Sequence, residues 1–396
     1  MRLLICAGGT GGGIYPALSV LKQMMSANPE SVPGMPAQTR EASVNDLQVL
    51  WVGGSGGMEE DLVKREGLRF ETIPAAGVHG VSWRALPGNL WMLGRGFFSS
   101  RRILRKFRPD VLFLTGGYVA VPMALAARFS KRSKSLLYVP DIEPGLALKT
   151  IARFSDCITL TVEESKAFFP DHPSRVVSGY PLRPGIDRWT SPEARSFFAL
   201  QEQLPVLLVF GGSKGARSIN QAVAAALPEL LQEMQVIHIT GKLDWQMVEQ
   251  ARAGLSTELL NRYRPYAYLY DEIGAAMCLA DLALTRAGAS TLGELPAFGL
   301  PAILVPYPYA WRYQRLNASY LVRHGAAVQI EDSQLADLII PKVRGLMADK
   351  NQLERMSQAM LALAKPDAAV RIASLLREQA ASSKQSGSQN VPNPND

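Results

Sequence analysis

The chain is poor in cysteine and histidine and has no long apolar run. Its three cysteines, Cys6, Cys157 and Cys278, lie far apart among 396 residues. Their odd number argues against a disulfide framework and favours a reducing cytoplasm. No stretch approaches the ~20 apolar residues that a membrane-spanning helix needs, and glycines interrupt the short N-terminal apolar run before a secretory signal could form. These absences predict a cytoplasmic protein that is soluble or lies on a membrane without crossing it.

The chain is rich in apolar residues and carries a net positive charge. Hydrophobic residues make up 47% of its 396 residues, which is ample for two packed cores and predicts two or three domains. The formal net charge is +7. A basic chain favours anionic partners such as nucleotides, acidic lipids or nucleic acid.

A glycine loop of a size to hold a phosphate occurs twice. The first, 8–13, follows the apolar run 3–7 and precedes a helix signalled by Pro16. The second, 211–215, follows the apolar run 206–210. A strand that turns through glycines into a helix leaves backbone N–H groups at the helix N-terminus, where they attract anions. Two such units predict two α/β domains that face each other across a cleft holding a phosphorylated ligand.

Apolar runs alternate with helical patterns along the chain, as in doubly wound α/β folds. We therefore predict two Rossmann-like domains, each built on a parallel sheet. The predicted strands are 2–7, 48–53, 69–73, 110–115, 135–139, 156–161 and 175–178 in the first half, and 206–210, 235–240, 264–269, 281–285, 302–305 and 327–330 in the second.

Glycine and proline between 179 and 185 mark the linker between the two domains. The tail is rich in Ser, Asn, Pro and Gln, a composition typical of disorder. The predicted segments are an N-terminal domain at 1–180, a C-terminal domain at 181–365, a helix at 366–381 that returns to the N-terminal domain, and a disordered tail at 382–396.

Other motifs compete for the glycine loops. The first loop is not a dinucleotide fingerprint, because Ile14 stands where the third glycine should be. A Walker loop is excluded at Gly241-Lys242, since Leu243 follows the lysine and the upstream glycine is missing. The nucleophile-elbow pattern of hydrolases does fit two segments, 53–57 and the second loop around Ser213. For Ser213, Asp281 and His324 could complete a triad. A Ser213 hydrolase therefore remains an alternative.

A third strand-loop-helix pattern spans 281–294 and ends in an acid. Its small residues can wrap a diphosphate through N–H and hydroxyl groups, and Glu294 lies about one turn into the following helix. A carboxylate there can accept hydrogen bonds from both hydroxyls of a ribose. An acid in the first turn also stabilises its own helix, so the sequence leaves ribose binding and helix stabilisation open.

With these residues in view, the chain resembles the MurG family. That family transfers N-acetylglucosamine from UDP-N-acetylglucosamine to undecaprenyl-diphospho-muramoyl-pentapeptide in peptidoglycan synthesis. The resemblance covers about residues 1–380. It implies an inverting hexosyltransferase of GT-B architecture with an N-terminal acceptor domain, a C-terminal donor domain, and no metal or cofactor. The motifs that carry it are Gly8-Gly9-Thr10-Gly11-Gly12, Pro16-Ala17-Leu18, Gly116-Gly117-Tyr118-Val119, Gly211-Gly212-Ser213-Lys214-Gly215-Ala216-Arg217, Arg286-Ala287-Gly288-Ala289, and Gln314 with Asn317-Ala318.

The resemblance also implies site residues, drawn from both domains. On the donor side they are Thr10, Gly11 and Gly12 at the sugar, Arg183 and Ser213 at the diphosphate, Tyr270 at the uracil through its backbone, Ala289, Ser290 and Thr291 around the phosphates, Glu294 at the ribose, and Gln314 at the sugar hydroxyls. On the acceptor side they are Gly13, Tyr118 and Asp141. Arg183 could instead be an ordinary solvated charge in the linker.

The chain departs from the family chiefly on the acceptor side. Gly13 replaces a histidine that is a candidate base, and Tyr138-Val139-Pro140-Asp141 replaces His-Glu-Gln-Asn. Tyr180 stands for an asparagine before the linker proline. We predict that Asp141 is the catalytic base or an acceptor contact, with Glu143 the other nearby acid. Three alternatives remain: Asp141 caps the following helix, the acceptor is a different molecule, or the chain binds a UDP-sugar without turnover.

Residues 83–108 combine large apolar side chains with seven basic residues and no acid. Such a composition is typical of a segment that lies on an anionic membrane, each cation adding ~1 kcal/mol near the surface. The predicted contacts are Trp83, Trp91, Phe97, Phe98, Arg101 and Arg102. The alternative is a helix with a core-facing apolar stripe and solvated arginines. We expect a peripheral protein on the cytoplasmic face of the cell membrane, with no nucleic-acid partner because no recognised binding module accompanies the charge.

Overall fold

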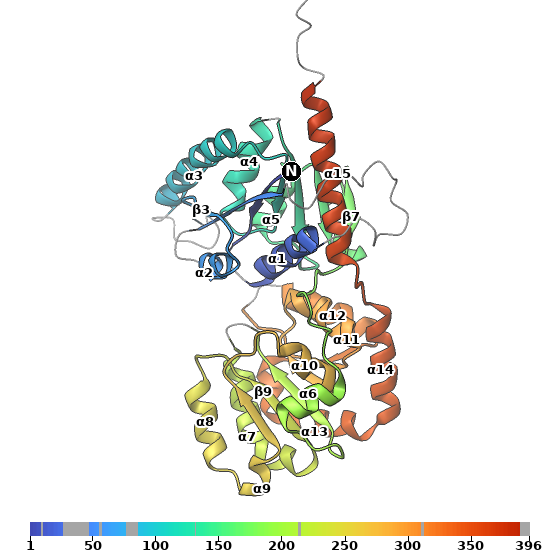
Figure 1. Ribbon diagram of the computed structural model, residues 1–396. Coiled ribbons are helices and arrows are strands. Elements are labelled where there is room, and N and C mark those ends of the chain that lie inside the picture. Colours follow the sequence, from blue (N-terminus) through green and yellow to red (C-terminus); the bar gives the residue numbers. More distant parts are fainter. Residues whose placement is uncertain are drawn as a thin grey trace, which may run out of the picture. The chain divides into compact units, whose positions relative to one another are not determined.

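The chain forms two compact units. Figure 1 shows them with the ribbon coloured along the sequence, from blue at the N-terminus to red at the C-terminus. The computed structural model describes residues 1–8, 11–26, 47–54, 58–76, 86–130, 132–212, 215–309 and 313–388. The N-terminal unit comprises Met1–Arg183 and Asp367–Asp396, and the C-terminal unit comprises Pro184–Pro366. The chain leaves the N-terminal unit between Arg183 and Pro184, three residues after the predicted boundary.

Seven parallel strands form the sheet of the N-terminal unit, in the order β3-β2-β1-β4-β5-β6-β7. Every residue of β4 is buried, as are residues 3–6 of β1. Continuous apolar strands of this kind suit a parallel sheet whose two faces are both covered by helices. The strands are β1 (Arg2–Cys6), β2 (Gln48–Gly53), β3 (Phe70–Thr72), β4 (Val111–Leu114), β5 (Lys134–Val139), β6 (Cys157–Leu160) and β7 (Arg175–Val177). The helices are α1 (Gly11–Ser26), α2 (Met58–Arg65), α3 (Leu86–Phe107), α4 (Ala120–Ser130), α5 (Leu146–Ala152), η4 (Glu163–Phe168) and α15 (Ala368–Ser388).

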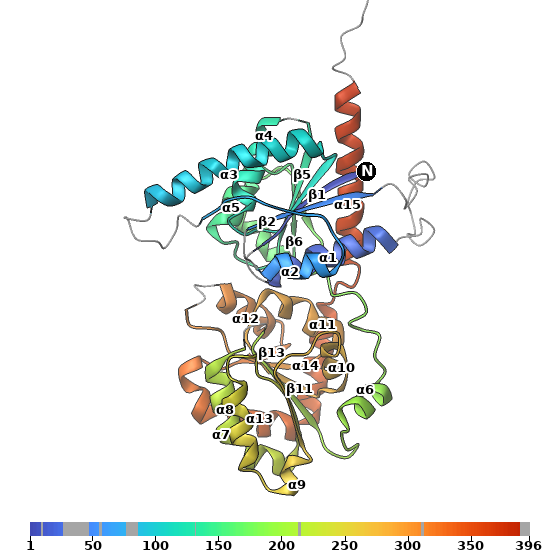
Figure 2. The same ribbon diagram turned by 60° about the vertical axis from the view of Figure 1, so that its left-hand side comes forward.

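Helix α15, at the end of the chain, packs on the N-terminal unit beside α1 and β5 (Figures 1 and 2). Arg377 donates to the carbonyl oxygen of Met24 at 3.4 Å, and the N–H of Lys134 donates to the hydroxyl of Ser383 at 3.0 Å. The helix continues to Ser388, so the predicted disordered tail is wrong for residues 382–388. Tertiary packing overrides a composition poor in apolar residues.

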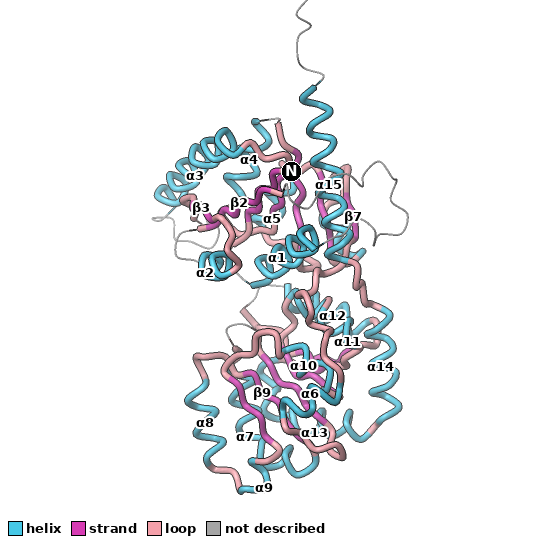
Figure 3. The backbone as a smooth tube through the Cα atoms, viewed as in Figure 1, coloured by secondary structure: helices cyan, strands magenta, loops and turns pink. Residues whose placement is uncertain are grey.

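The C-terminal unit holds a second parallel sheet of six strands, in the order β10-β9-β8-β11-β12-β13. Figure 3 shows its strands in magenta and its helices in cyan. The strands are β8 (Val206–Phe210), β9 (Gln235–Ile239), β10 (Tyr263–Tyr266), β11 (Leu282–Thr285), β12 (Ala302–Leu304) and β13 (Ala327–Gln329). The helices are α6 (Ser191–Phe198), α7 (Arg217–Glu233), α8 (Trp245–Ala253), α9 (Thr257–Leu260), α10 (Ile273–Leu279), η5 (Ala289–Leu292), α11 (Glu294–Phe298), α12 (Tyr313–Arg323), η6 (Asp332–Gln334), α13 (Leu335–Ala348) and α14 (Lys350–Ala362).

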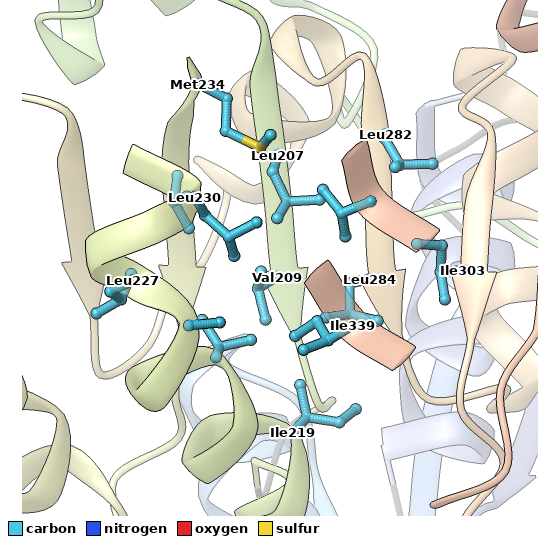
Figure 4. Packing of buried hydrophobic residues seen from close by; sticks show 14 of the residues in the cluster. Leu207, Val209, Ile219, Leu227, Leu230, Met234, Leu282, Leu284, Ile303 and Ile339 are labelled. Atoms are coloured by element: carbon cyan, nitrogen blue, oxygen red, sulfur yellow. The ribbon is translucent and has the colours of Figure 1, made fainter. Parts of the chain in front are cut away.

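The core of the C-terminal unit joins β8 to α7 (Figure 4). Leu207 and Val209 of the strand belong to one buried cluster with Ile219, Leu227 and Leu230 of the helix. The spacing of these three α7 residues places them on one helical face. Burying each such side chain contributes ~1.5–3 kcal/mol, so the strand and the helix that flank the second glycine loop are firmly held.

The two predicted α/β sheets are confirmed, with small differences at element ends. β10 stops at Tyr266 instead of residue 269, because it is an edge strand whose only partner, β9, ends its pairing at Ile239. α1 begins at Gly11 and contains Pro16, which does not mark its start. In the described part of the chain, no helix has both the length and the hydropathy to cross a membrane.

Candidate active site

The first glycine loop leads from β1 into α1, whose first turn begins with Gly11 and Gly12. Gly117, in the turn after β4, has a φ of +81°, and a Cβ there would lie 2.7 Å from the carbonyl oxygen of Gly8. Only glycine permits this conformation and this approach. The turn after β4 therefore packs directly on the loop, and it carries Tyr118, which is 51% exposed.

Arg183 contacts helix α1, which follows the first glycine loop. Its guanidinium carbon is 4.6 Å from the centre of the Tyr15 ring, in the first turns of α1. A cation over an aromatic face is held by electrostatic attraction of ~0.5–2 kcal/mol. Arg183 is half-buried, so it is not the fully solvated linker charge of the alternative reading.

The second glycine loop joins β8 to α7. Gly215 has a φ of +78°, and a Cβ there would lie 2.2 Å from the carbonyl oxygen of Thr240. The loop thus rests on the turn that follows β9. No side chain caps α7 at Ala216, and its first turn, from Arg217, holds no acid. Uncapped N–H groups and the positive end of the helix dipole make this N-terminus suitable for an anion.

The loop after β11 contains most of the predicted ribose and phosphate contacts. Ala289 and Thr291 are buried, and the Thr291 hydroxyl donates to the carbonyl oxygen of Gly288 at 2.5 Å. Ser290 is the half-exposed hydroxyl of this turn. Glu294, which is 3% exposed, is the first residue of α11. This position suits both a ribose contact and stabilisation of the helix, so the structure keeps both readings open.

Tyr270 and Gln314 lie on two further loops of the same unit. The backbone N–H of Tyr270 donates to the carboxylate of Glu272 at 3.0 Å, so a uracil would meet its carbonyl group or displace this bond. The amide oxygen of Gln314 accepts from the N–H of Tyr307 at 2.8 Å. This bond orients the side chain, whose amide nitrogen is the group that can donate to a sugar hydroxyl.

Arg286 serves as a structural residue. It is 8% exposed and donates to the carbonyl oxygen of Val305, to the carboxylate of Asp332 and to the hydroxyl of Ser218. The Ser218 hydroxyl in turn donates to Asp332 at 2.7 Å. Arg286 thereby ties the loop after β11 to the first turn of α7.

Helix α3 presents an apolar and basic face to solvent. Trp91 and Phe98 are each 70% exposed. Arg95 and Arg102 are exposed too, and each follows one of these aromatic residues by four positions, so that they share the same face of the helix. Arg101 is also exposed. Phe97 is half-buried and packs partly against the core, and its ring centre also lies 5.6 Å from that of Phe98. A cavity of about 390 Å³ at the C-terminal ends of α3 and α4 is lined by Arg101, Arg105, Arg108 and Arg132, with Phe129 and a single acid, Asp110.

Thr10, Ser213 and Trp83 lie outside the described residues. Among the residues that the structure does describe, no group of three His, Cys, Asp or Glu side chains could hold a metal ion.

Comparison with known proteins places this chain in a family. The glycosyltransferase family 28 N-terminal domain matches residues 3–159, and the glycosyltransferase family 28 C-terminal domain matches residues 206–372. The chain is 37% identical to a protein of Roseiflexus sp. strain RS-1, over 95% of this chain and 94% of that protein. It is also 37% identical to a protein of Desulforudis audaxviator, over 93% and 95%. Both relatives are named UDP-N-acetylglucosamine–N-acetylmuramyl-(pentapeptide) pyrophosphoryl-undecaprenol N-acetylglucosamine transferase.

The chain belongs to the MurG family. Among solved structures, MurG of Acinetobacter baumannii aligns with a TM-score of 0.71 and 23% identity, over 95% of this chain and 99% of its own. A UDP-GlcNAc 2-epimerase of Neisseria meningitidis aligns with a TM-score of 0.65 and 12% identity, over 96% and 100%. These two likenesses concern the fold, which is GT-B.

Tyr138 and Tyr180, two positions at which the sequence departs from the MurG family pattern, contact each other. Tyr138 is fully buried, its hydroxyl lies 2.9 Å from that of Thr161, and its ring meets Tyr180 edge-on at 6.4 Å. Burial, then Tyr180, raises the pKa of Tyr138. Tyr138 and Tyr180 thus form a buried aromatic pair.

Asp141 lies two residues beyond β5, at the carboxyl edge of the sheet, and is half-buried. The N-cap of the following helix, α5, is Gly145. The alternative in which Asp141 caps that helix is therefore wrong. The carboxyl edge is where open α/β sheets bind their ligands.

The geometry also excludes the hydrolase alternative. The carboxylate of Asp281 accepts from the N–H of Val206 at 2.7 Å, at the amino end of β8. The loop 211–215 follows the opposite end of that strand, about 16 Å away for five extended residues. Asp281 therefore cannot join a triad with a serine in that loop.

Sequence reasoning missed Glu59, a buried acid of α2 beside the first glycine loop. Glu59 is 3% exposed, and one of its oxygens accepts from the N–H of Gly54 at 3.2 Å. Its other oxygen and the hydroxyl of buried Thr115 have no hydrogen-bond partner in the described part of the chain. Burial, then Glu59, raises the pKa of the Cys6 thiol. The glycines at 53 and 54 could have pointed to a functional site near Glu59. In the sequence they indicated only a possible nucleophile elbow.

Proposed function

We propose that this chain transfers N-acetylglucosamine from UDP-N-acetylglucosamine to undecaprenyl-diphospho-muramoyl-pentapeptide. The observation that carries the proposal is the match, over 95% of the chain, to a relative named for this reaction. The two glycine loops add physical support, because each ends in a helix N-terminus suited to a phosphate. The acceptor hydroxyl oxygen attacks the anomeric carbon, the bond from that carbon to the diphosphate breaks, and UDP leaves with inversion.

The donor-side residues act on binding and on the leaving group. Negative charge grows on the diphosphate as UDP departs, and fixed N–H groups and cations aimed at that charge lower the barrier. We assign this role to the N-terminus of α7 and to Arg183. Glu294 would accept from the ribose hydroxyls, and Gln314 would donate to the sugar. Thr10, Gly11, Gly12, Ser213, Tyr270 and the turn from Ala289 to Thr291 complete the proposed donor site.

We propose Asp141 as the base that takes the proton of the acceptor hydroxyl, or as part of the acceptor contact with Gly13 and Tyr118. Gly13 has no side chain that could hold a proton. Asp141 lies at the ligand-binding edge of its sheet, and it is not the α5 cap. A positioned base typically contributes 10²–10⁴-fold to such a reaction.

We propose that the exposed face of α3 binds the cytoplasmic face of the cell membrane. Trp91 and Phe98 would enter the interface, and Arg95, Arg101 and Arg102 would meet anionic headgroups. The cavity at the end of this helix adds three further guanidinium groups, those of Arg105, Arg108 and Arg132, beside that of Arg101. Co-sedimentation tests the face: Trp91→Ser with Phe98→Ser should release the protein from vesicles containing anionic phospholipid, and retention equal to wild type would contradict it.

One assay tests the transfer reaction directly. UDP release from UDP-N-acetylglucosamine is measured with and without the undecaprenyl-linked muramoyl-pentapeptide. We expect release that depends on the acceptor and survives EDTA. UDP binding without any acceptor-dependent release would favour the non-catalytic relative, and release with a different lipid-linked or small-molecule acceptor would reassign the substrate.

A further inference from the structure

Arg217, the first residue of α7, is an exposed cation held by a buried carboxylate. Its Nε donates to the Oδ1 atom of Asp244 at 3.0 Å. The Arg217 side chain is 74% exposed, whereas that of Asp244 is 5% exposed. A guanidinium held through Nε still has its two terminal nitrogens to offer, and Arg commonly binds phosphate with a pair of parallel N–H groups. The buried acid thus fixes the direction of a solvent-facing cation at the second glycine loop.

Asp244 is itself fixed by Asn220. The side-chain nitrogen of Asn220 donates to the Asp244 Oδ2 atom at 2.9 Å and to the carbonyl oxygen of Thr240 at 2.8 Å. Thr240 is the residue on which Gly215 of the loop rests. The Asn220 amide therefore orients both Asp244, which binds Arg217, and the Thr240 carbonyl group, on which Gly215 packs.

His238 determines the orientation of that amide. Because both Asn220 N–H groups are used, its oxygen must accept, and it lies 3.0 Å from Nε2 of His238. Nε2 therefore carries the proton, and Nδ1 accepts from the Tyr263 hydroxyl at 2.8 Å. Burial lowers the pKa of His238 to about 3, which keeps the ring neutral. With the histidine neutral and in one tautomer, the donor and the acceptor of each hydrogen bond in the series are fixed. The series runs from Tyr263 through His238, Asn220 and Asp244 to Arg217.

The position of Arg217 opposes helix stability. A cation in the first turn of a helix faces the positive end of the dipole, which costs ~0.3–1 kcal/mol, and α7 has no acid in that turn. Burying several polar side chains behind it also costs desolvation unless all of them are paired. An anion at the N-terminus of α7 would reverse the first of these costs.

We infer that Arg217 contacts the diphosphate of the donor nucleotide, and that Asp244, Asn220 and His238 are positioning residues for it. This inference rests on the proposed function for the identity of the ligand. Arg217 approaches the phosphates from α7, and the buried residues act through it without touching the nucleotide. The network also keeps the loop backbone at Gly215 in place, so the N–H groups and the cation reach one anion together.

Calorimetry with the full chain tests the contact, using UDP and uridine as probes. We expect Arg217→Gln to weaken UDP binding at least ~10-fold, as one charged hydrogen bond of ~1.5–3 kcal/mol is lost, and to leave uridine binding unchanged. UDP affinity should also fall less steeply with salt in this variant. Arg344→Gln is the matched control, because Arg344 pairs with Glu229 and Glu233 in the last turns of the same helix. It should change neither affinity.

His238→Gln tests the positioning role, with thermal unfolding measured in parallel. We expect UDP affinity to fall several-fold with a flatter salt dependence, as in Arg217→Gln, while uridine binding holds in the folded fraction. Equal UDP affinity and salt dependence in wild type and in folded Arg217→Gln would overturn the inference. A wild-type protein that binds no UDP would instead refute the proposed function on which it rests.

Discussion

The two glycine loops differ in the side chains that lie beside them. Behind the loop of the C-terminal unit, His238, Asn220 and Asp244 form a buried chain in which each polar side chain has a partner. Beside the loop of the N-terminal unit, an oxygen of Glu59 and the hydroxyl of Thr115 are buried without a partner in the described part of the chain. A buried polar group without a hydrogen bond costs ~1–3 kcal/mol. The loop of the C-terminal unit thus has paired side chains behind it, whereas the described residues beside the loop of the N-terminal unit include two buried oxygens without a partner.

The same division separates what this chain shares with the MurG family from what it has changed. In the C-terminal unit, Asn220, His238 and Asp244 form a hydrogen-bonded network in which replacing one member would leave another unpaired. The changes at Gly13, Tyr138 and Tyr180 all lie in the N-terminal unit. Tyr138 and Tyr180 are packed as a pair, and the Tyr138 hydroxyl lies 2.9 Å from that of Thr161.

The largest expected effect concerns Asp141, and it tests whether the N-terminal unit still supplies catalysis. Asp141→Asn keeps the size of the side chain and removes its ability to take a proton. We expect kcat to fall at least ~100-fold, as for a lost general base, with an unchanged melting temperature. Turnover with the lipid-linked acceptor, normalised to folded protein, measures it.

Glu143→Gln is the control for Asp141, because it neutralises an acid two residues away. Glu143 is 4% exposed and lies 3.8 Å from Lys149, so this variant should lower stability more than kcat. If Asp141→Asn turns over normally while Glu143→Gln does not, the base has been assigned to the wrong acid.

The second effect concerns Glu294 and the donor site. Glu294→Ala removes the proposed acceptor of the ribose hydroxyls and should weaken UDP binding by ~1–3 kcal/mol, as measured by calorimetry. Glu331→Ala, which removes an acid paired with Arg315 in the same unit, should leave UDP affinity unchanged. If Glu294→Ala loses stability but binds UDP as tightly as wild type, Glu294 only stabilises α11.

The sequence was sufficient for the fold because the fold depends on long apolar strands and on glycines at forced positions. Gly117 and Gly215 mark backbone approaches that no other residue permits, and both stand in the motifs that carry the family resemblance. The networks behind the loops were not predictable. Asn220, His238 and Asp244 are spread over α7, β9 and the turn before α8, and each alone is typical of an ordinary helix or strand.

The third effect is a dependence of stability on pH that should originate in the C-terminal unit. His238 has a pKa of about 3 when folded and an ordinary value of 6.5 when unfolded. The unfolded chain therefore binds the extra proton between these values, and stability falls as the pH drops below about 6.5. From pH 7 to 4.5 this residue should cost about 2–3 kcal/mol at 1.36 kcal/mol per pH unit.

His238→Gln isolates that contribution by comparison with wild type. Denaturant unfolding of both proteins at pH 7 and 4.5 should show their stability difference shrinking by about 2–3 kcal/mol at the lower pH. The groups nearest the ring are Tyr263 and, through Asn220, Asp244 and Arg217. A stability difference that stays constant with pH would mean that the imidazole is protonated or hydrated in the folded protein.

The smallest expected effect is on stability, and it comes from replacing one buried threonine next to each loop by valine. Thr240 is fully buried and its hydroxyl donates to the carbonyl oxygen of Gly241 at 3.0 Å, so Thr240→Val should lower the free energy of unfolding by ~1–2 kcal/mol. Thr115 is also buried, but its hydroxyl has no partner among the described residues, so the nearly isosteric Thr115→Val should change stability by less than ~0.5 kcal/mol. Denaturant unfolding of the two variants measures this contrast.

The Thr115 variant also has an informative outcome in the activity assay. A Cβ at Gly13 would lie 3.0 Å from the Thr115 hydroxyl, so this hydroxyl borders the position that carries histidine in the family. If Thr115→Val keeps its stability but raises the KM for the acceptor, the unpaired hydroxyl is a group that the bound acceptor satisfies. If instead Thr115→Val is as destabilised as Thr240→Val, Thr115 has a partner in solution and the two loops are supported alike. That result would remove the contrast between the paired side chains behind the loop of the C-terminal unit and the unpaired oxygens beside the loop of the N-terminal unit.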